Sequence, residues 1–163
     1  MRYLPVLLSL FLAAASGELH AVDKADSVLV VKSERKLYLV RDEKPYASFS
    51  VTFGSNPKGH KQKQGDGRTP EGLYVLDYKN ATSNYYRSIH ISYPNDEDRS
   101  NARSLGISPG GDIMIHGQKN GFAWLGPLSG FVNWTDGCIA VRDREMDLLW
   151  EAIDPGTPIE IRP

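Results

Sequence analysis

Apolar and polar residues alternate along much of the chain, which is the pattern of strands with one buried face. Residues 47–53 (ASFSVTF) show it most clearly, because every second residue is apolar and the residues between are Ser or Thr. Alternating or β-rich runs bounded by turn residues predict strands at 27–32, 37–41, 47–53, 73–78, 85–93, 112–116 and 157–162. The pattern therefore predicts a mainly β fold.

Two segments have helical features instead. Residues 96–103 (DEDRSNAR) place acids first and a base last, an order that suits the helix dipole. Residues 143–153 carry apolar side chains with partly helical spacing, and we expect Asp143 to be the N-cap of this helix and Pro155-Gly156 to end it. One or two short helices are therefore expected beside the strands.

The N-terminal segment MRYLPVLLSLFLAAASGELHA has one positive charge, a short apolar stretch and then small residues. The apolar stretch is too short to cross a bilayer comfortably, so residues 1–17 are interpreted as a signal peptide, with an alternative cut after residue 21. A buried N-terminal helix is the other interpretation. The signal peptide predicts an exported protein, periplasmic or secreted, with no membrane span and with its domain at residues 27–162.

Composition narrows the classes of function. The 163 residues are 40% hydrophobic and 24% charged, which fits one globular domain with a core of its own. The formal net charge is −1, so nothing in the charge balance indicates a nucleic-acid partner. No cluster of His, Cys, Asp and Glu has metal-ligand spacing, and we expect neither a metal nor another cofactor.

Cys138 is the only cysteine of the chain. An exported chain with one cysteine cannot form an internal disulfide, so the thiol is either unpaired by accident or kept for its reactivity. A nucleophilic thiol needs a base, usually a histidine that is close in space. His20 lies at the processing site and His60 in a polar loop, which leaves His90 and His116.

The surroundings of His116 and Cys138 are typical of active sites. His116 ends the apolar run DIMIH and is followed by Gly117. Gly137 precedes Cys138 and permits an unusual backbone turn, in which successive N–H groups can point at the oxygen of an acyl intermediate. Either signal alone is weak, because a buried structural cysteine beside a strand is the usual case.

Three motifs in a fixed order make the signal specific. They are GRTPEGLYVL (67–76), SPGGDIMIHG (108–117) and TDGCIAV (135–141). With them the chain resembles the YkuD-type L,D-transpeptidases, which carry a His-Gly or His-Ser pair and, after a loop, [Ser/Thr]-His-Gly-Cys. The resemblance runs from about residue 27 to residue 161. It implies a YkuD-like β-sandwich in which the thiol and the imidazole face one groove.

The resemblance also implies catalytic roles. Cys138 would be the nucleophile and His116 its base, the Gly117 carbonyl would orient the imidazole, and the N–H groups of Gly137 and Cys138 would form the oxyanion hole. The implied reaction attacks the third, L-centred residue of a peptidoglycan stem peptide and releases the terminal D-alanine. The acyl group then passes to an amine on another stem or on a wall-attached lipoprotein.

Two other functions fit the same sequence. If water took the acyl group, the same residues would make a hydrolase that trims stems or releases a wall-attached protein. A protein of another class, a non-catalytic cell-wall-binding module, would carry Cys138 as a buried residue. Ordinary thiol reactivity, with no pH dependence displaced below that of free cysteine, would favour this module.

Asp136 departs from the family motif, in which a second histidine is commoner, whereas Thr135 matches the family's Ser/Thr. A carboxylate close to a thiol disfavours the thiolate, so we expect Asp136 to point away from Cys138, toward a loop or the substrate. The departure suggests the single-domain, murein transpeptidase-like branch of the family, in which transfer and hydrolysis are hard to tell apart. Thr135 and Asp136 are therefore candidates for substrate binding.

Three further substrate-binding candidates have weaker support. His90 lies on an alternating strand, where a structural role is favoured about two to one over substrate contact. Trp124 and Trp134 either stack on a sugar and shield the acyl-enzyme or only pack their loop. The polar loop at 54–68 is expected to be exposed and is a candidate for a mobile lid. Its basic residues either hold substrate carboxylates or, as we expect, are solvated: Lys58, Lys61, Lys63 and Arg68.

Overall fold

The structure, a computed structural model, describes residues 23–122, 124 and 132–163. The expected signal peptide, at residues 1–17, and the alternative cut after residue 21 lie outside the described residues. Within the described part, no helix has both the length and the apolar character that a membrane span requires.

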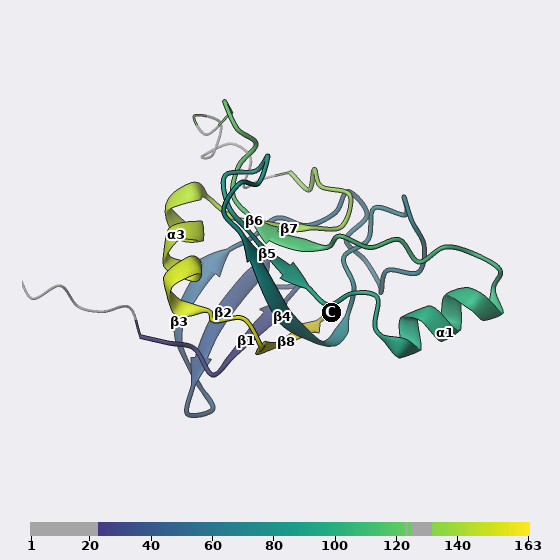
Figure 1. The fold of residues 1–163 in the computed structure, drawn as a ribbon, viewed down its shortest axis with the longest axis horizontal. Coiled ribbons are helices and arrows are strands. Elements are labelled where there is room, and N and C mark those ends of the chain that lie inside the picture. Colours follow the sequence, from purple (N-terminus) through teal and green to yellow (C-terminus); the bar gives the residue numbers. More distant parts are fainter. Residues whose placement is uncertain (1–22, 123, 125–131) are drawn as a thin grey trace, which may run out of the picture.

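The described chain forms one eight-stranded sheet with the strand order β3-β2-β1-β8-β4-β5-β6-β7. Helices α1 and α3 lie at opposite ends of this sheet (Figure 1). The mainly β fold with two short helices is therefore confirmed. The strands are β1 (Ser27–Val31), β2 (Lys36–Arg41), β3 (Lys44–Ser50), β4 (Gly72–Asn80), β5 (Ser88–Ile91), β6 (Met114–His116), β7 (Ile139–Ala140) and β8 (Thr157–Arg162).

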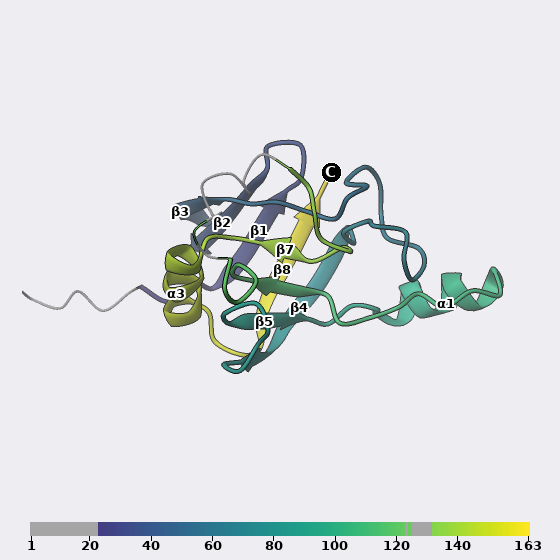
Figure 2. The same cartoon turned by 90° about the horizontal axis from the view of Figure 1, so that it is seen from above.

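The sheet curls until its two edges meet. The chain that leaves β3 at one edge pairs with β7 at the other, because Thr52 and Ala140 exchange two backbone hydrogen bonds of 3.0 and 2.9 Å. A second bridge joins Gly54 to Thr135. The curled arrangement is visible when the molecule is seen from above (Figure 2). One continuous sheet thus supplies both layers of the expected sandwich.

Two strands are shorter than the alternation predicts, and each is interrupted by a residue with left-handed backbone. The strand expected at 85–93 begins only at Ser88, because Tyr86 has φ 64°, and it ends at Ile91. The strand expected from residue 112 begins only at Met114, because Asp112 has φ 55°. Extended backbone requires negative φ, so these two residues end the regular pairing and turn the chain into loops.

The two described helices differ in their N-cap residues. In α1 (Asp96–Ser104), Asn95 is the N-cap, and Asn95 and Asp98 satisfy each other's backbone N–H groups in a capping box. In α3 (Asp143–Ala152), the N-cap is Arg142, so the expectation that Asp143 would be the N-cap is wrong by one residue. The carboxylate of Asp143 instead accepts a hydrogen bond from the backbone N–H of Gln118 at 2.7 Å.

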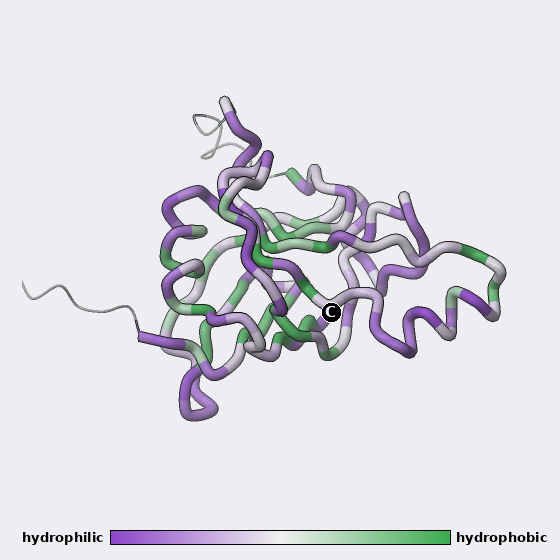
Figure 3. The backbone as a smooth tube through the Cα atoms, viewed as in Figure 1, coloured by the Kyte–Doolittle hydropathy of each residue, from purple (hydrophilic) through white to green (hydrophobic). Residues whose placement is uncertain are grey.

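The hydrophobic core fills the inside of the curled sheet. Apolar residues concentrate on the strands, while α1 is mostly hydrophilic (Figure 3). Met146 and Leu149 of α3 are fully buried in this core. Ile115 and Ile139 are also fully buried, and they are the direct neighbours of His116 and Cys138 in sequence. The two candidate catalytic residues are therefore each next in sequence to a fully buried core residue.

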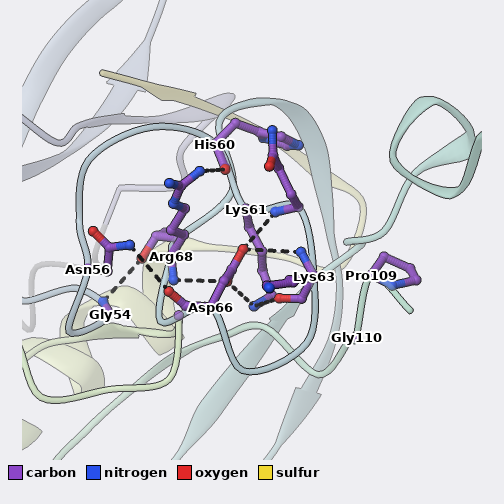
Figure 4. A network of polar contacts seen from close by, with 12 residues as sticks. Gly54, Asn56, His60, Lys61, Lys63, Asp66, Arg68, Pro109 and Gly110 are labelled. Atoms are coloured by element: carbon purple, nitrogen blue, oxygen red, sulfur yellow. Dashed lines mark hydrogen bonds and ion pairs between the residues drawn. The ribbon is translucent and has the colours of Figure 1, made fainter. Parts of the chain in front are cut away.

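The polar loop at residues 54–68 is held together by the Asp66 carboxylate (Figure 4). This carboxylate accepts hydrogen bonds from the backbone N–H groups of Gln62, Lys63 and Arg68 at 2.8–3.1 Å and pairs with the Lys61 ammonium at 2.9 Å. Lys61 is only 3% exposed. The expectation of a solvated loop is therefore wrong for Lys61, although Lys58 and Lys63 are exposed.

Burial alone would raise the pKa of Asp66, but the three backbone N–H groups and the Lys61 ammonium outweigh it and lower the pKa to about 2. A carboxyl whose pKa is lower in the folded state stabilises the fold above its unfolded pKa, and this stability is lost as the pH falls through the folded pKa. The contribution of Asp66 is therefore complete near neutral pH and is lost as the pH falls from about 4 toward 2.

We predict that Asp66→Asn lowers the free energy of unfolding by about 2 kcal/mol at pH 7. The difference from the wild type should shrink at pH 3, as measured by urea unfolding at both pH values. Asp154→Asn, which removes a carboxylate from an exposed ion pair with Lys24, is the control and should change stability little. An equal effect of Asp66→Asn at pH 7 and pH 3 would contradict the assigned network.

Candidate active site

The parallel pairing of β6 and β7 brings the two candidate catalytic residues together. In this register Ile115 lies opposite Ile139 and His116 opposite Ala140. One step back along both strands, Cys138 lies beside Met114, whose backbone N–H donates to the Cys138 Sγ at 3.4 Å. Cys138 and His116 are thus two residues apart along the ladder, and because side chains alternate between the two faces, the imidazole and the thiol lie on the same face of two neighbouring strands.

His116 and Cys138 line one cavity of about 370 Å³. The wall also contains groups that sequence reasoning did not identify, half of them on the turn that joins β4 to β5. The residues around the cavity are Asn80, Thr82, Ser83, Asn84, Tyr85, Ser88, Asp112, Met114, His116, Trp134, Thr135, Asp136 and Cys138. A cavity of this size suits a few residues of a peptide.

His116 is 4% exposed and is held in one orientation. Its Nδ1 lies 2.7 Å from the carbonyl oxygen of Gly117. A carbonyl only accepts hydrogen bonds, so Nδ1 carries the proton and Nε2 presents a lone pair. The ring packs against Tyr85 and Trp134, with centroid distances of 4.6 and 5.8 Å. The histidine is therefore arranged to accept a proton at Nε2.

The Cys138 thiol makes its contacts with the backbone. Besides the Met114 N–H, its Sγ lies 3.6 Å from the Asp112 carbonyl oxygen. Within the described residues, Cys138 and His116 share the cavity without a hydrogen bond between them. Hydrogen bonds of catalytic groups often form only when substrate is bound. The pair is thus adjacent in the fold but not joined at rest.

Burial keeps both groups uncharged. It lowers the pKa of His116, against the smaller, raising effect of the Gly117 carbonyl. It raises the pKa of the Cys138 thiol; the Met114 N–H opposes this rise, and the negative charge of Asp136 adds to it. At neutral pH the site therefore holds a neutral thiol beside a neutral imidazole, so the proton must leave sulfur during the attack on a substrate.

The turn before the thiol is stabilised by Thr135. Its hydroxyl donates to the Cys138 carbonyl at 2.7 Å and accepts the Gly137 N–H at 3.3 Å. Gly137 has φ 128°, and a Cβ there would lie 2.5 Å from the Arg68 carbonyl oxygen, so both conformation and space require glycine. The Gly137 N–H, expected in the oxyanion hole, is bonded to Thr135 in the resting structure.

Comparison with known proteins assigns this arrangement to a family. The model of the YkuD family, the L,D-transpeptidase catalytic domain, matches residues 25–161. The chain belongs to the YkuD family. Its matching region covers nearly all of the described structure, including the cavity and both strands that carry His116 and Cys138.

The relatives of this YkuD domain are longer proteins. Putative L,D-transpeptidase YafK from Escherichia coli K12 is 34% identical over 96 residues, which are 55% of this chain and 37% of YafK. The helical cell shape determining protein Pgp2 from Campylobacter jejuni has a TM-score of 0.61 and 25% identity, covering 82% of this chain and 46% of Pgp2. The chain therefore spans about half the length of these relatives, or less.

A more distant structure shows the shared fold. The L,D-transpeptidase from Xylanimonas cellulosilytica has a TM-score of 0.53 and 15% identity, covering 85% of this chain and 61% of the other. At this identity the likeness concerns the fold alone. The YkuD-like fold expected from the motifs is thus confirmed.

Asp136 lies on the wall of the YkuD cavity together with Cys138. It is exposed, and its charge raises the pKa of the thiol. Its place on the cavity wall agrees with the expectation that Asp136 faces the substrate, although its charge still acts on the thiol. Asp136 and Asp112 also border a neighbouring cavity of about 600 Å³, so the two carboxylates form the boundary between the two hollows.

The remaining candidates separate into two groups. Trp134 lines the cavity, and its indole Nε1 is buried without a hydrogen-bond partner among the described residues. Trp124 is 74% exposed and is not part of the cavity wall. His90 pairs with Asp77 at 2.6 Å and stacks on Tyr78, also outside the cavity wall. The structure thus brings Trp134 to the site, but neither Trp124 nor His90.

The described residues contain no set of side chains arranged as metal ligands. Among them, no group of three or more His, Cys, Asp and Glu side chains is placed to hold a metal ion. The described cavity wall includes a thiol, an imidazole and backbone N–H groups, the set that acyl transfer through a thioester needs.

We predict that iodoacetamide alkylates Cys138 with a pH midpoint above the value of about 8.5 for free cysteine, because burial raises the pKa of this thiol. Asp136→Asn should lower that midpoint, since it removes a nearby negative charge. The alkylation rate is followed by intact mass from pH 6 to pH 10. A plateau of fast alkylation already at pH 6 would show a resting thiolate and contradict this electrostatic description. The raised midpoint does not distinguish an enzyme from the non-catalytic module, although the sequence suggested that criterion, because a base can take the proton of a neutral thiol when substrate is bound.

Proposed function

We propose that this protein is an exported cysteine acyltransferase of peptidoglycan, an L,D-transpeptidase. The observation that carries the proposal is the orientation of His116 by the Gly117 carbonyl in the cavity that also contains the Cys138 thiol. Membership in the YkuD family supports a peptidoglycan stem peptide as the substrate. The N-terminal segment supports a periplasmic or secreted location at the cell wall.

In the first step the Cys138 sulfur attacks the carbonyl carbon of the third, L-centred residue of the stem. The thiol proton passes to Nε2 of His116 as the C–S bond forms, because Nδ1 already holds a proton against Gly117. When the tetrahedral intermediate collapses, the bond to the terminal D-alanine breaks and His116 returns the proton to the departing amine. A thioester on Cys138 and free D-alanine result.

The oxyanion of this intermediate is stabilised by the N–H groups of Cys138 and Gly137. The Gly137 N–H bond to the Thr135 hydroxyl is long, at 3.3 Å, and hydrogen bonds to a charged acceptor are stronger than those to a neutral one. The developing oxyanion therefore competes well for this N–H group. Thr135 keeps the turn in place through its 2.7 Å bond to the Cys138 carbonyl.

In the second step an amine, neutral when it reacts, attacks the thioester carbonyl carbon, and His116 accepts a proton from it. The C–S bond then breaks, and His116 returns the proton to the Cys138 sulfur, which restores the thiol. The acceptor is an amine on a second stem or on a wall-attached lipoprotein. Asp112 and Asp136 on the cavity wall favour the approach of a cationic amine, which supports transfer. Hydrolysis by water is the competing fate of the same thioester, and a role in cell shape is proposed by analogy with the description of Pgp2.

We predict that the purified protein converts a tetrapeptide stem and an amine acceptor into a cross-linked product with loss of D-alanine. Cys138→Ala and Cys138→Ser should give no product and should remain folded, because the thiolate and not packing carries the reaction. Mass spectrometry distinguishes the cross-link from the tripeptide that hydrolysis leaves. Imipenem, present in a solved structure of LdtMt1, should add its mass to the wild type only.

Turnover in Cys138→Ala would end the thioester mechanism. A tripeptide without cross-link, even with amine present, would assign the protein to the hydrolases. A wild type that forms neither product nor imipenem adduct would support the non-catalytic wall-binding module.

We predict that substitutions of two polar residues of the cavity change the acylation rate to very different extents. His116→Ala should slow single-turnover acylation by about 10²–10⁴-fold, the range typical of general base loss. Asp136→Asn should retain most of the rate, because the carboxylate has no proton to transfer in this mechanism and its charge opposes the thiolate. Rapid-quench mass spectrometry of the acyl-enzyme measures both. A larger loss in Asp136→Asn than in His116→Ala would reverse the assigned roles.

A further inference from the structure

We propose that Asp143 is a positioning residue that acts on His116 through the peptide bond between Gly117 and Gln118. The inference rests on the proposed function, in which His116 is the base. It assigns a task to a side chain that does not line the cavity and belongs to none of the sequence motifs.

The geometry joins three groups in one line of hydrogen bonds. The Gly117 carbonyl oxygen lies 2.7 Å from His116 Nδ1. The next atom of the same peptide unit, the Gln118 N–H, donates to the Asp143 Oδ1, also at 2.7 Å. One planar amide is therefore bonded to the imidazole at its oxygen and to a carboxylate at its nitrogen.

A carboxylate at one end of an amide changes the charge at the other end. The Gln118 N–H donates to a charged acceptor, and such bonds are short and strong. Hydrogen bonds in a chain polarise one another, so the Gly117 oxygen becomes more negative. When His116 takes the thiol proton, this oxygen accepts a hydrogen bond from an imidazolium. Asp143 thus favours the charged form of His116 without receiving a proton itself.

The Asp143 carboxylate and the Tyr86 side chain lie so close to Gly117 that no side chain fits at this position. A Cβ on residue 117 would lie 2.6 Å from the Asp143 Oδ1 and 2.9 Å from the Tyr86 Cβ. Any larger residue would therefore displace the carboxylate or the peptide. The glycine of the His-Gly pair is required here by the closeness of its neighbours.

Further hydrogen bonds and core packing hold the Gly117–Gln118 peptide and the Asp143 carboxylate in place. The Gln118 side chain donates to the Val141 carbonyl at 2.8 Å, and the Val141 N–H donates to the His116 carbonyl at 2.9 Å. Asp143 is the first residue of α3, whose Met146 is fully buried in the core. The Asp143 carboxylate is therefore held by a helix that packs into the core, next to the end of strand β6.

A simpler role for Asp143 would be to stabilise the N-terminus of α3 as an acid in its first turn. Glu145 provides the matched comparison, because it is also acidic and in the first turn. Its carboxylate accepts the Arg142 backbone N–H at 3.1 Å and has no bond to the Gly117–Gln118 peptide. The Glu145 carboxylate also pairs with the Arg142 guanidinium. Removing its charge therefore tests the loss of a first-turn carboxylate and of this ion pair, without any change at the Gly117–Gln118 peptide.

The other polar and ionisable groups around His116 are the same in both variants. Tyr85 packs on the imidazole. Cys138, Asp112 and Asp136 share its cavity. The Gly117 N–H donates to a backbone carbonyl, that of Arg87, at 3.2 Å. A change that occurs in the Asp143 variant and not in the Glu145 variant is therefore assigned to the Asp143 carboxylate.

The experiment compares Asp143→Asn with Glu145→Gln in the full chain. The Asn side chain keeps an oxygen for the Gln118 N–H and loses only the charge. NMR of labelled histidine gives the titration midpoint of His116, assigned with His116→Gln. We expect Asp143→Asn to lower the midpoint by roughly half a pH unit or more. It should also slow single-turnover acylation about fivefold, as for exchange of a charged for a neutral hydrogen bond.

Glu145→Gln should move neither quantity, although it should lower thermal stability about as much as Asp143→Asn does. Equal midpoints in the two variants would overturn the proposal and leave Asp143 as a helix-end residue. Asp143→Ser, which also keeps an oxygen acceptor near the helix end, replaces Asp143→Asn if the latter does not fold.

The two readouts separate this inference from the proposed function. The titration needs no substrate, so a wild type that transfers no acyl group would refute the proposed function while the midpoints still test Asp143. A wild type that acylates normally, with an unchanged midpoint in Asp143→Asn, would refute the role of Asp143 alone.

Discussion

The parallel pairing of β6 with β7 is the constraint on which the site depends. Two short strands, anchored by the buried Ile115 and Ile139, place the imidazole and the thiol on the same face, opposite to the one that these two isoleucines bury. The bridge between Thr52 and Ala140 adds a partner on the other side of β7, so this strand is not a free edge. The positions of His116 and Cys138 therefore follow from core packing and backbone pairing.

Burial determines the protonation states of the thiol and the imidazole at rest. The same desolvation that raises the pKa of Cys138 lowers the pKa of His116, so the neutral pair is the stable resting state. A thiol that is mostly protonated is protected from unspecific oxidation and alkylation, because the thiolate is the reactive form. Reactivity then depends on the substrate, which must supply the oxyanion that the turn before Cys138 stabilises and draw the proton onto His116.

Much of the fold could be predicted from the sequence, because alternation and end signals are local. The strands β4 and β8 and the helix α1 follow from such patterns. The left-handed backbone of Tyr86 and Asp112 could not be predicted, because neither residue is a glycine and tertiary contacts decide its conformation.

The motifs identified His116 and Cys138 as candidates. The approach of Asp143 to the Gly117 peptide depends on segments that meet only in the folded chain, and so does the position of Lys61 beside residues 108–113.

The central claim is that Cys138 and His116 form a thioester with a stem peptide. The most direct test is acid quenching of a single turnover, followed by proteolysis and tandem mass spectrometry of the peptide that contains Cys138. The account predicts a tripeptide acyl group on the Cys138 sulfur, formed at the rate at which D-alanine is released and absent in the Cys138→Ser variant. Release of D-alanine without any acyl group on Cys138, or with the group on another residue, would contradict it.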